Sequence, residues 1–325
     1  MNKRLFRIFS VIPLVALILS ACSGLTSSAP VAASTPLRVS WSLWPGWYPA
    51  VIAQQKGLFK KHGVEVELVF YHTYKDQLPA LASGLLDGSA LVIGDALLDQ
   101  VAEKVKIVMI TDNSNGADQL VAGPGILSPA DVVGKKVGVQ SGTFGQLLVQ
   151  EMLKQNKLPI DSVSYVDVSP EFVPNAIPNQ IDFGHTFEPY ASQARAKGFK
   201  PIFTSADTPG LIADVVAFRR KIIEQRPEDV KAFIAAWFEA AQYWQANPKE
   251  GNAIIATATG QKEKDISLEG VKMFDLPANL NAFKPGNDTT SLYFTAQYEL
   301  RFLVDTGVIS NPVKPEDLLD SSFLQ

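Results

Sequence analysis

Acidic and aromatic side chains recur in the short segments that follow the predicted strands of this chain. The segment Trp41–Ala50, WSLWPGWYPA, holds three of the five tryptophans together with Tyr48. Later segments of the same kind supply four carboxylates, which are Asp95, Asp118, Glu188 and Asp214. A cation over an indole face gains about 0.5–2 kcal/mol, and a free oxyanion would instead need concentrated positive charge. The combination predicts a site for an amine or a nitrogen heterocycle with a planar or apolar body.

The tryptophan segment divides into two parts. Trp41 lies inside or at the end of the first predicted strand, which favours packing in the core. Pro45 and Gly46 require a loop, and Pro49 fits the start of the next helix. The loop residues Trp44, Trp47 and Tyr48 therefore lie at the carboxyl edge of the predicted sheet, where open α/β sheets bind ligands. We expect these three aromatic side chains to stack against the ligand.

Each of the other candidate residues also has a structural explanation. Asn115 and Asp118, in DNSNGADQLVA, could belong to an ordinary Asn-Gly turn. Thr143 with Gln146 fits a capping box, although a helix start also leaves N–H groups free for the anionic end of a ligand. Phe187 and Glu188 precede Pro189, so the carboxylate could serve only the helix dipole. Asp95 and Asp214 could be strand-end residues, yet we include all of them as candidate ligand contacts.

Motifs for catalysis and for cofactor or metal binding are absent from the sequence. The three histidines, His62, His72 and His185, lack metal-ligand spacing. Neither a nucleophile elbow, a Walker motif nor a dinucleotide-binding glycine motif occurs. We therefore predict a binding protein and not an enzyme, with no cofactor and no metal. The formal net charge of −4 gives no indication of nucleic-acid binding.

Strands and helices alternate through the body of the chain, which predicts an α/β fold. The first unit has predicted strands at 37–42, 64–71, 89–94 and 106–111, and helices at 49–61, 75–88 and 95–104. The second has predicted strands at 135–140, 163–168, 179–185, 200–205 and 213–220, and helices at 143–156 and 189–198. A helical tail follows, with predicted helices at 226–246, 251–258, 267–274 and 291–307. We expect two doubly wound parallel lobes, with the tail packed on the first.

The N-terminus has the pattern of a secretory signal. Basic residues precede an apolar run from Ile8 to Leu19, and the sequence LSAC ends at Cys22, the only cysteine. This ending resembles a bacterial lipobox, which implies that residues 1–21 are removed and Cys22 is lipidated; an ordinary signal peptide is the alternative. Removing three positive and no negative charges changes the net charge from −4 to about −7. Residues 22–36 are rich in Ser, Ala and Pro, which predicts a flexible tether.

Five motifs occur in an order that resembles a known family: GLF, ALASGLLDG, DNSNGAD, VGKKVGVQSGT and TFEPY. They are similar to those of ABC-importer substrate-binding proteins for nitrate, sulfonate, taurine and thiamine-pyrimidine precursors. The resemblance implies a periplasmic-binding-protein fold with two lobes, two crossovers and a ligand cleft between them. We place lobe 1 at 37–118 and 214–325, and lobe 2 at 119–213.

The resemblance also implies how such a protein works. It would be a monomer outside the cytoplasm, held at the membrane by its lipid, closing on a small solute and delivering it to a permease with its ATPase subunits. Three alternatives remain: an oxyanion-binding protein of the same family, a surface-anchored enzyme of the same fold, and a sensor subunit.

Overall fold

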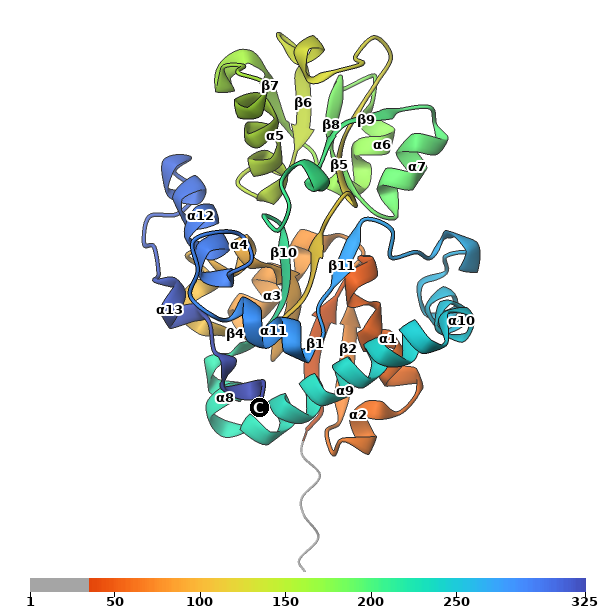
Figure 1. The fold of residues 1–325 in the computed structure, drawn as a ribbon, viewed down its shortest axis with the longest axis vertical. Coiled ribbons are helices and arrows are strands. Elements are labelled where there is room, and N and C mark those ends of the chain that lie inside the picture. Colours follow the sequence, from red (N-terminus) through yellow and green to blue (C-terminus); the bar gives the residue numbers. More distant parts are fainter. Residues whose placement is uncertain (1–34) are drawn as a thin grey trace, which may run out of the picture. The chain divides into compact units, whose positions relative to one another are not determined.

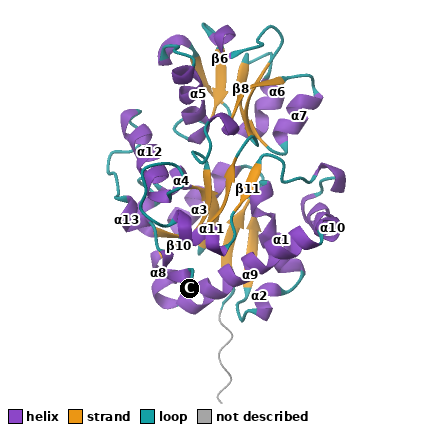
Figure 2. Cartoon of the chain, viewed as in Figure 1, coloured by secondary structure: helices purple, strands orange, loops and turns teal. Residues whose placement is uncertain are grey.

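The computed structural model describes residues 35–325, which form one compact unit. The predicted signal segment 1–21, Cys22 and nearly all of the predicted tether lie outside the described residues. Helices surround two separate β-sheets (Figures 1 and 2). None of the helices in residues 35–325 combines the length and the apolar character needed to span a bilayer.

The first sheet has six strands in the order β11-β4-β10-β3-β1-β2. Its strands are β1 (Leu37–Trp41), β2 (Val66–Phe70), β3 (Gly88–Val92), β4 (Val105–Ser114), β10 (Ala213–Arg219) and β11 (Val271–Met273). Strand β1 pairs in parallel with β2 and β3, whereas β10 pairs antiparallel with both β3 and β4. The expectation of a purely parallel sheet is therefore wrong. Strand β10 enters from the second sheet and inserts between β3 and β4, which reverses its direction relative to both.

Helices pack on both flanks of this sheet (Figure 1). One group contains α1 (Tyr48–Gln55), α2 (Leu58–Lys61), α9 (Pro227–Ala246) and α10 (Pro248–Thr259), which contact one another. A second group contains α4 (Ile93–Ala96), α12 (Leu292–Asp305) and α13 (Pro315–Leu318), in which α12 contacts the other two. Helix α3 (Gln77–Ser83) packs on β3, α8 (Arg220–Gln225) contacts α9, and α11 (Leu276–Ala282) packs on β4. Trp237 of α9 is buried against Phe233, which in turn stacks on Phe59 of α2 at 5.2 Å. The helical tail therefore packs back on the first unit, as predicted.

The second sheet has five strands in the order β7-β6-β8-β5-β9. They are β5 (Asp118–Ala122), β6 (Lys136–Val139), β7 (Ser164–Asp167), β8 (Phe183–Phe187) and β9 (Lys200–Thr204). Its helices are α5 (Phe144–Gln155), α6 (Val173–Ala176) and α7 (Tyr190–Ala196). We call the unit around the first sheet lobe 1 and the unit around the second sheet lobe 2.

The chain passes between the lobes twice, once from β4 to β5 and once from β9 to β10. Hydrogen bonds join the two crossovers. Ser114 Oγ lies 2.7 Å from Ser205 Oγ, and the backbone N–H of Gly116 donates to Ser205 Oγ at 2.7 Å. Gly116 has φ 118°, a conformation that favours glycine. Two α/β lobes joined by two crossovers form the periplasmic-binding-protein fold, as expected from the sequence.

Three predicted helices differ in the structure. The helix expected at 49–61 is interrupted at Gly57, which has φ 67°. The region 95–104 contains only the end of α4 and a short 3₁₀ segment, Ala102–Lys104. The region 267–274 forms β11, because Gly270, at φ 76°, allows the next residues to pair with the edge of β4. Pairing with another strand decides this last case, and helical periodicity cannot detect it.

Candidate functional site

A pocket lies where the two lobes meet. Residues of both lobes line it: Ser42, Trp44, Trp47, Tyr74, Val92, Asp118, Phe144, Phe187, Ile212 and Asp214. The space between its atoms is about 260 Å³, part of which is open to solvent.

Aromatic rings form a continuous wall across the two lobes. In lobe 1, Trp47 lies against Tyr74 at 5.7 Å between ring centroids, with the planes inclined by 32°. Tyr74 meets Phe144 of lobe 2 edge-on at 6.1 Å, and Trp44 meets Phe187 in the same way at 6.0 Å. Such rings suit a planar or cationic ligand.

Asp112 holds the loop that carries both tryptophans. Trp44 Nε1 donates to Asp112 Oδ1 at 3.0 Å, and Thr111 Oγ1 donates to Asp112 Oδ2 at 2.8 Å. A Cβ on Gly46 would overlap the same carboxyl group. This glycine therefore allows the loop backbone to approach the carboxylate closely.

Asp112 and Asp214 are paired residues of the antiparallel strands β4 and β10. Both are buried, and their carboxyl groups interact electrostatically. Burial raises the pKa of Asp112 to about 7, although its hydrogen-bond partners act in the opposite direction. Burial and the charge of Asp112 raise the pKa of Asp214 well above its ordinary value. Two carboxyl groups in such an arrangement retain a proton near neutral pH.

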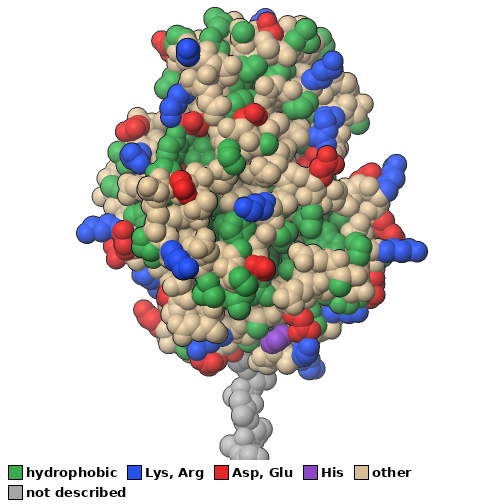
Figure 3. All heavy atoms as spheres, in the orientation of Figure 1, with side chains coloured by type: hydrophobic (Ala, Val, Ile, Leu, Met, Phe, Trp, Pro, Cys, Tyr) green, Lys and Arg blue, Asp and Glu red, His purple; other side chains and the backbone are tan. Residues whose placement is uncertain are grey.

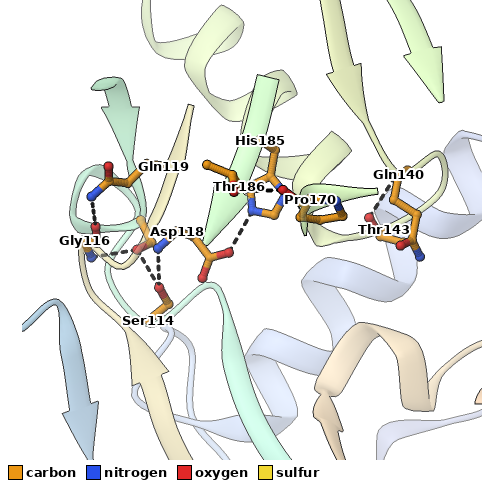
Figure 4. Close-up of polar contacts among 10 residues, drawn as sticks. Ser114, Gly116, Asp118, Gln119, Gln140, Thr143, Pro170, His185 and Thr186 are labelled. Atoms are coloured by element: carbon orange, nitrogen blue, oxygen red, sulfur yellow. Dashed lines mark hydrogen bonds and ion pairs between the residues drawn. The ribbon is translucent and has the colours of Figure 1, made fainter. Parts of the chain in front are cut away.

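Asp118, the first residue of β5, points toward His185 of β8 (Figure 4). His185 Nε2 lies 2.7 Å from Asp118 Oδ1, and both side chains are buried. The backbone N–H of Asp118 also donates to Ser114 Oγ at 3.0 Å. Within residues 35–325, Asp118 Oδ2 has no hydrogen-bond partner, so one carboxylate oxygen is available to a ligand.

Asp95 lies behind the wall of the pocket and does not line it. It accepts a hydrogen bond from the hydroxyl of Tyr74, which in turn accepts one from the backbone N–H of Val92 at 2.9 Å. Burial raises the pKa of Asp95 to about 6. Burial and then the charge of Asp95 raise the pKa of neighbouring Glu299 well above its usual range. The structure thus places Asp95 where it orients Tyr74 and has no surface in the pocket.

Tyr48 and Asn115 also lie away from the pocket. The Tyr48 ring packs edge-on against Trp41 at 6.4 Å, and its hydroxyl accepts from Gln261 Nε2 at 2.7 Å. Asn115 lines a separate depression beside β11, where Lys272 is also found. Both residues follow a strand, but their side chains turn to other surfaces.

Thr143 and Glu188 make contacts within lobe 2. The expected capping box is absent: Thr143 Oγ1 donates to the carbonyl of Gln140 at 2.8 Å (Figure 4), and Gln146 Oε1 accepts from the N–H of Gly142. Glu188 forms an ion pair with Arg195 at 2.6 Å and accepts from the N–H of Ser192. Neither Thr143 nor Glu188 lines the pocket.

Of the residues proposed from the sequence, the structure thus gathers five around one pocket: Trp44, Trp47, Asp118, Phe187 and Asp214. It adds others that the sequence did not single out, among them Ser42, Tyr74 and Phe144. Tyr74 follows the predicted strand at 64–71, so the strand-end pattern that selected the other candidates applies to it as well. The sequence predicted the correct helix start, but it selected Thr143 as the contact, whereas the next residue, Phe144, lines the pocket. Within residues 35–325, no group of three or more His, Cys, Asp or Glu side chains is arranged to hold a metal ion.

Comparisons with known proteins agree with this architecture. A protein of Brucella abortus (strain 2308) named as a binding protein is 31% identical over 298 residues, covering 89% of this chain and 92% of the relative. The taurine-binding periplasmic protein of Escherichia coli (strain K12) is 24% identical, covering 77% of this chain and 82% of that protein. The structure of the alkanesulfonate-binding protein SsuA from Xanthomonas axonopodis pv. citri, bound to MOPS, matches with a TM-score of 0.73 at 14% identity, covering 89% of this chain and 99% of that one. A family model described as NMT1/THI5 like matches residues 44–251, and the chain belongs to that family.

Proposed function

We propose that this protein is the solute-binding component of an ABC importer and that it captures a small nitrogen-containing organic solute. The solute carries a cationic or N–H-rich group. The observation that supports this class is the lining of the pocket. Within residues 35–325, that lining contains two acidic side chains, Asp118 and Asp214, with aromatic rings beside them and no Lys or Arg.

The charge of the lining argues against a free oxyanion. A nitrate or sulfonate group in this pocket would lie beside buried Asp118 with no Lys or Arg in the lining to balance it, and desolvating an unpaired charge is costly. An amine, an amidine or a protonated heterocycle would instead gain the attraction of the carboxylate and of the rings. The oxyanion specificity of the relatives is therefore not transferred to this chain.

The remaining parts of the proposal concern how the protein works in the cell. Residues 37–118 with 214–325, and residues 119–213, act as the two closing lobes. Cys22 carries the lipid that holds the protein at the outer face of the membrane, where it meets a permease and its ATPase. The names of the relatives as binding proteins support a non-catalytic role.

Isothermal titration calorimetry on the purified full-length protein tests the charge class of the ligand. We expect benzamidinium to bind and nitrate and sulfate, which carry no cationic group, not to bind. Asp118→Asn should weaken amidinium binding at least tenfold, because it removes a buried charge-assisted contact. Asp161→Asn, which changes an exposed carboxylate in lobe 2, should have no effect. Tight binding of nitrate or sulfate alone that Asp118→Asn leaves unchanged would overturn the proposal.

A further inference from the structure

Two buried polar groups in the wall of the pocket have no hydrogen-bond partner within residues 35–325. They are the hydroxyl of Ser42 and the indole N–H of Trp47. Their residues are only 3% and 2% exposed. An unpaired buried polar group costs roughly 1–3 kcal/mol. Two such groups in one pocket indicate that a bound molecule supplies the missing partners.

The two tryptophans of the same loop differ in this respect. Trp44 Nε1 donates to Asp112 and is committed to the protein. The ring of Trp47 is held in place because it packs against Tyr74, whose hydroxyl is hydrogen-bonded to Asp95 and to the N–H of Val92. Its own N–H has no partner within residues 35–325. The N–H of Trp47 is therefore held in a fixed position and remains free to donate a hydrogen bond to a ligand.

A similar contrast exists between two serines near the end of β1. Ser40 Oγ donates to Ser89 Oγ at 2.8 Å inside the sheet. Ser42 lies just beyond the strand and lines the pocket, where its hydroxyl has no partner among the described residues. An indole N–H can only donate, and a hydroxyl can donate. Together they form a place for a hydrogen-bond acceptor.

We infer that the pocket recognises a two-ended solute. Asp118 and Asp214 take its cationic or N–H-donating end, and Trp47 Nε1 and Ser42 Oγ donate to an acceptor oxygen or ring nitrogen elsewhere on the same molecule. The first half of this inference rests on the proposed function, and the second half does not. Ser42 and Trp47 are then specificity-determining residues, which favour ligands with an acceptor over plain amines of the same size. They take the part that the sequence assigned to the helix start at Thr143.

Three probes of the same shape and charge isolate the acceptor. Benzamidinium has a ring of carbon atoms, whereas pyridine-3-carboxamidinium and pyridine-4-carboxamidinium replace one C–H by an acceptor nitrogen at two positions. Calorimetry on the full-length protein gives the three dissociation constants. We expect at least one pyridine probe to bind about three- to tenfold more tightly than benzamidinium, the size of one net hydrogen bond.

Two substitutions then assign the effect to its donors. Trp47→Phe keeps a ring against Tyr74 and removes the N–H, and Ser42→Ala removes the hydroxyl. At least one of them should abolish the preference for the pyridine probe, measured as the ratio of the pyridine and benzamidinium dissociation constants within the same variant. The controls are Trp237→Phe, which changes a buried tryptophan of α9, and Ser40→Ala, which changes a buried serine of β1. Both controls should retain the preference.

The possible failures are distinguishable. If all three probes bind equally and neither Trp47→Phe nor Ser42→Ala alters their ratio, the acceptor site is wrong while the cation site stands. An ordered water that bridges Ser42 and Trp47 in a crystal structure with bound amidinium leads to the same conclusion. If no amidinium binds at all, the proposed charge class itself is wrong.

Discussion

Asp214 lies directly opposite Asp112 across the antiparallel strands β10 and β4, with both side chains buried in the interior. One of them, Asp214, lines the pocket, and the other holds Trp44 of the pocket wall. The protonation state of the pair therefore affects both the stability of lobe 1 and the net charge of the pocket lining.

This pair should make the ligand-free protein less stable as the pH rises. In the unfolded chain an aspartate titrates near 3.9, whereas the pKa of Asp112 in the folded protein is about 7. The folded protein thus holds a proton that the unfolded chain has lost, and stability falls between these two values. Buried Asp95 and Glu299, whose pKa values are also raised, act in the same direction. Urea denaturation from pH 5 to pH 8 measures the slope.

Asp112→Asn should reduce that slope, because the amide cannot titrate but can still accept from Trp44. A shift of about three pKa units corresponds to at most about 4 kcal/mol. Between pH 5 and pH 8, the free energy of unfolding should therefore fall by a few kcal/mol less, on the order of that limit, in Asp112→Asn than in the wild type. Asp161→Asn should leave the slope unchanged. Equal slopes for the wild type and Asp112→Asn would contradict the protonated pair.

Gly46→Ala should destabilise the protein and weaken ligand binding, because the new methyl group would overlap the carboxyl group of Asp112. Overpacking of this kind costs roughly 1–3 kcal/mol, which chemical denaturation can measure. The double variant with Asp112→Ala provides the control. If the overlap is the cause, Gly46→Ala should cost much less in that background, and strictly additive effects would show that it has another cause.

Tyr298→Phe should weaken binding by favouring separation of the lobes. The hydroxyl of Tyr298, on α12 of lobe 1, donates to Glu151 and accepts from Lys154 Nζ at 3.0 Å, both on α5 of lobe 2. Losing these contacts should lower affinity for the amidinium probe about two- to tenfold and increase the radius of gyration in small-angle scattering. Tyr293→Phe, on the same helix, is the matched control. No change in either measurement would mean that this contact does not hold the lobes together.

Cys22→Ser should release the protein from the membrane fraction of a bacterial host and abolish labelling with an alkyne fatty acid. Acyl chains bind membranes through about 0.8 kcal/mol per buried CH₂ group, so a lipidated protein sediments with the membranes. Ser23→Ala changes the neighbouring residue and should retain both label and sedimentation. An unlabelled wild type in the soluble fraction would favour the ordinary signal peptide.

Acidic and basic side chains are interspersed on the face shown in Figure 3. Exposed charges of this kind contribute little each to stability, so the stability effects predicted above come from buried groups.

The sequence by itself determined the alternation of strands and helices and the edge of the sheet where the candidate pocket residues gather. Loop residues Trp44 and Trp47 could be assigned because parallel strands end at one edge of a sheet, and Asp118 because a crossover begins there. These are local patterns, and a strand or a helix start is largely a local property of the chain. The same patterns also selected Tyr48 and Glu188, which follow the rule and still turn away from the pocket.

Only the tertiary structure decided which side chains meet. Asp112 and Asp214 become partners because β10 inserts next to β4 from far along the chain, and no spacing in the sequence indicates this pairing. His185 reaches Asp118 in the same way, through the antiparallel pairing of β8 with β5. The sequence also could not predict that Ser42 Oγ and Trp47 Nε1 lack a hydrogen-bond partner within residues 35–325. Whether an atom has a partner depends on all the residues packed around it. Strand order and packing therefore turn a general expectation of aromatic and acidic residues into a specific pocket.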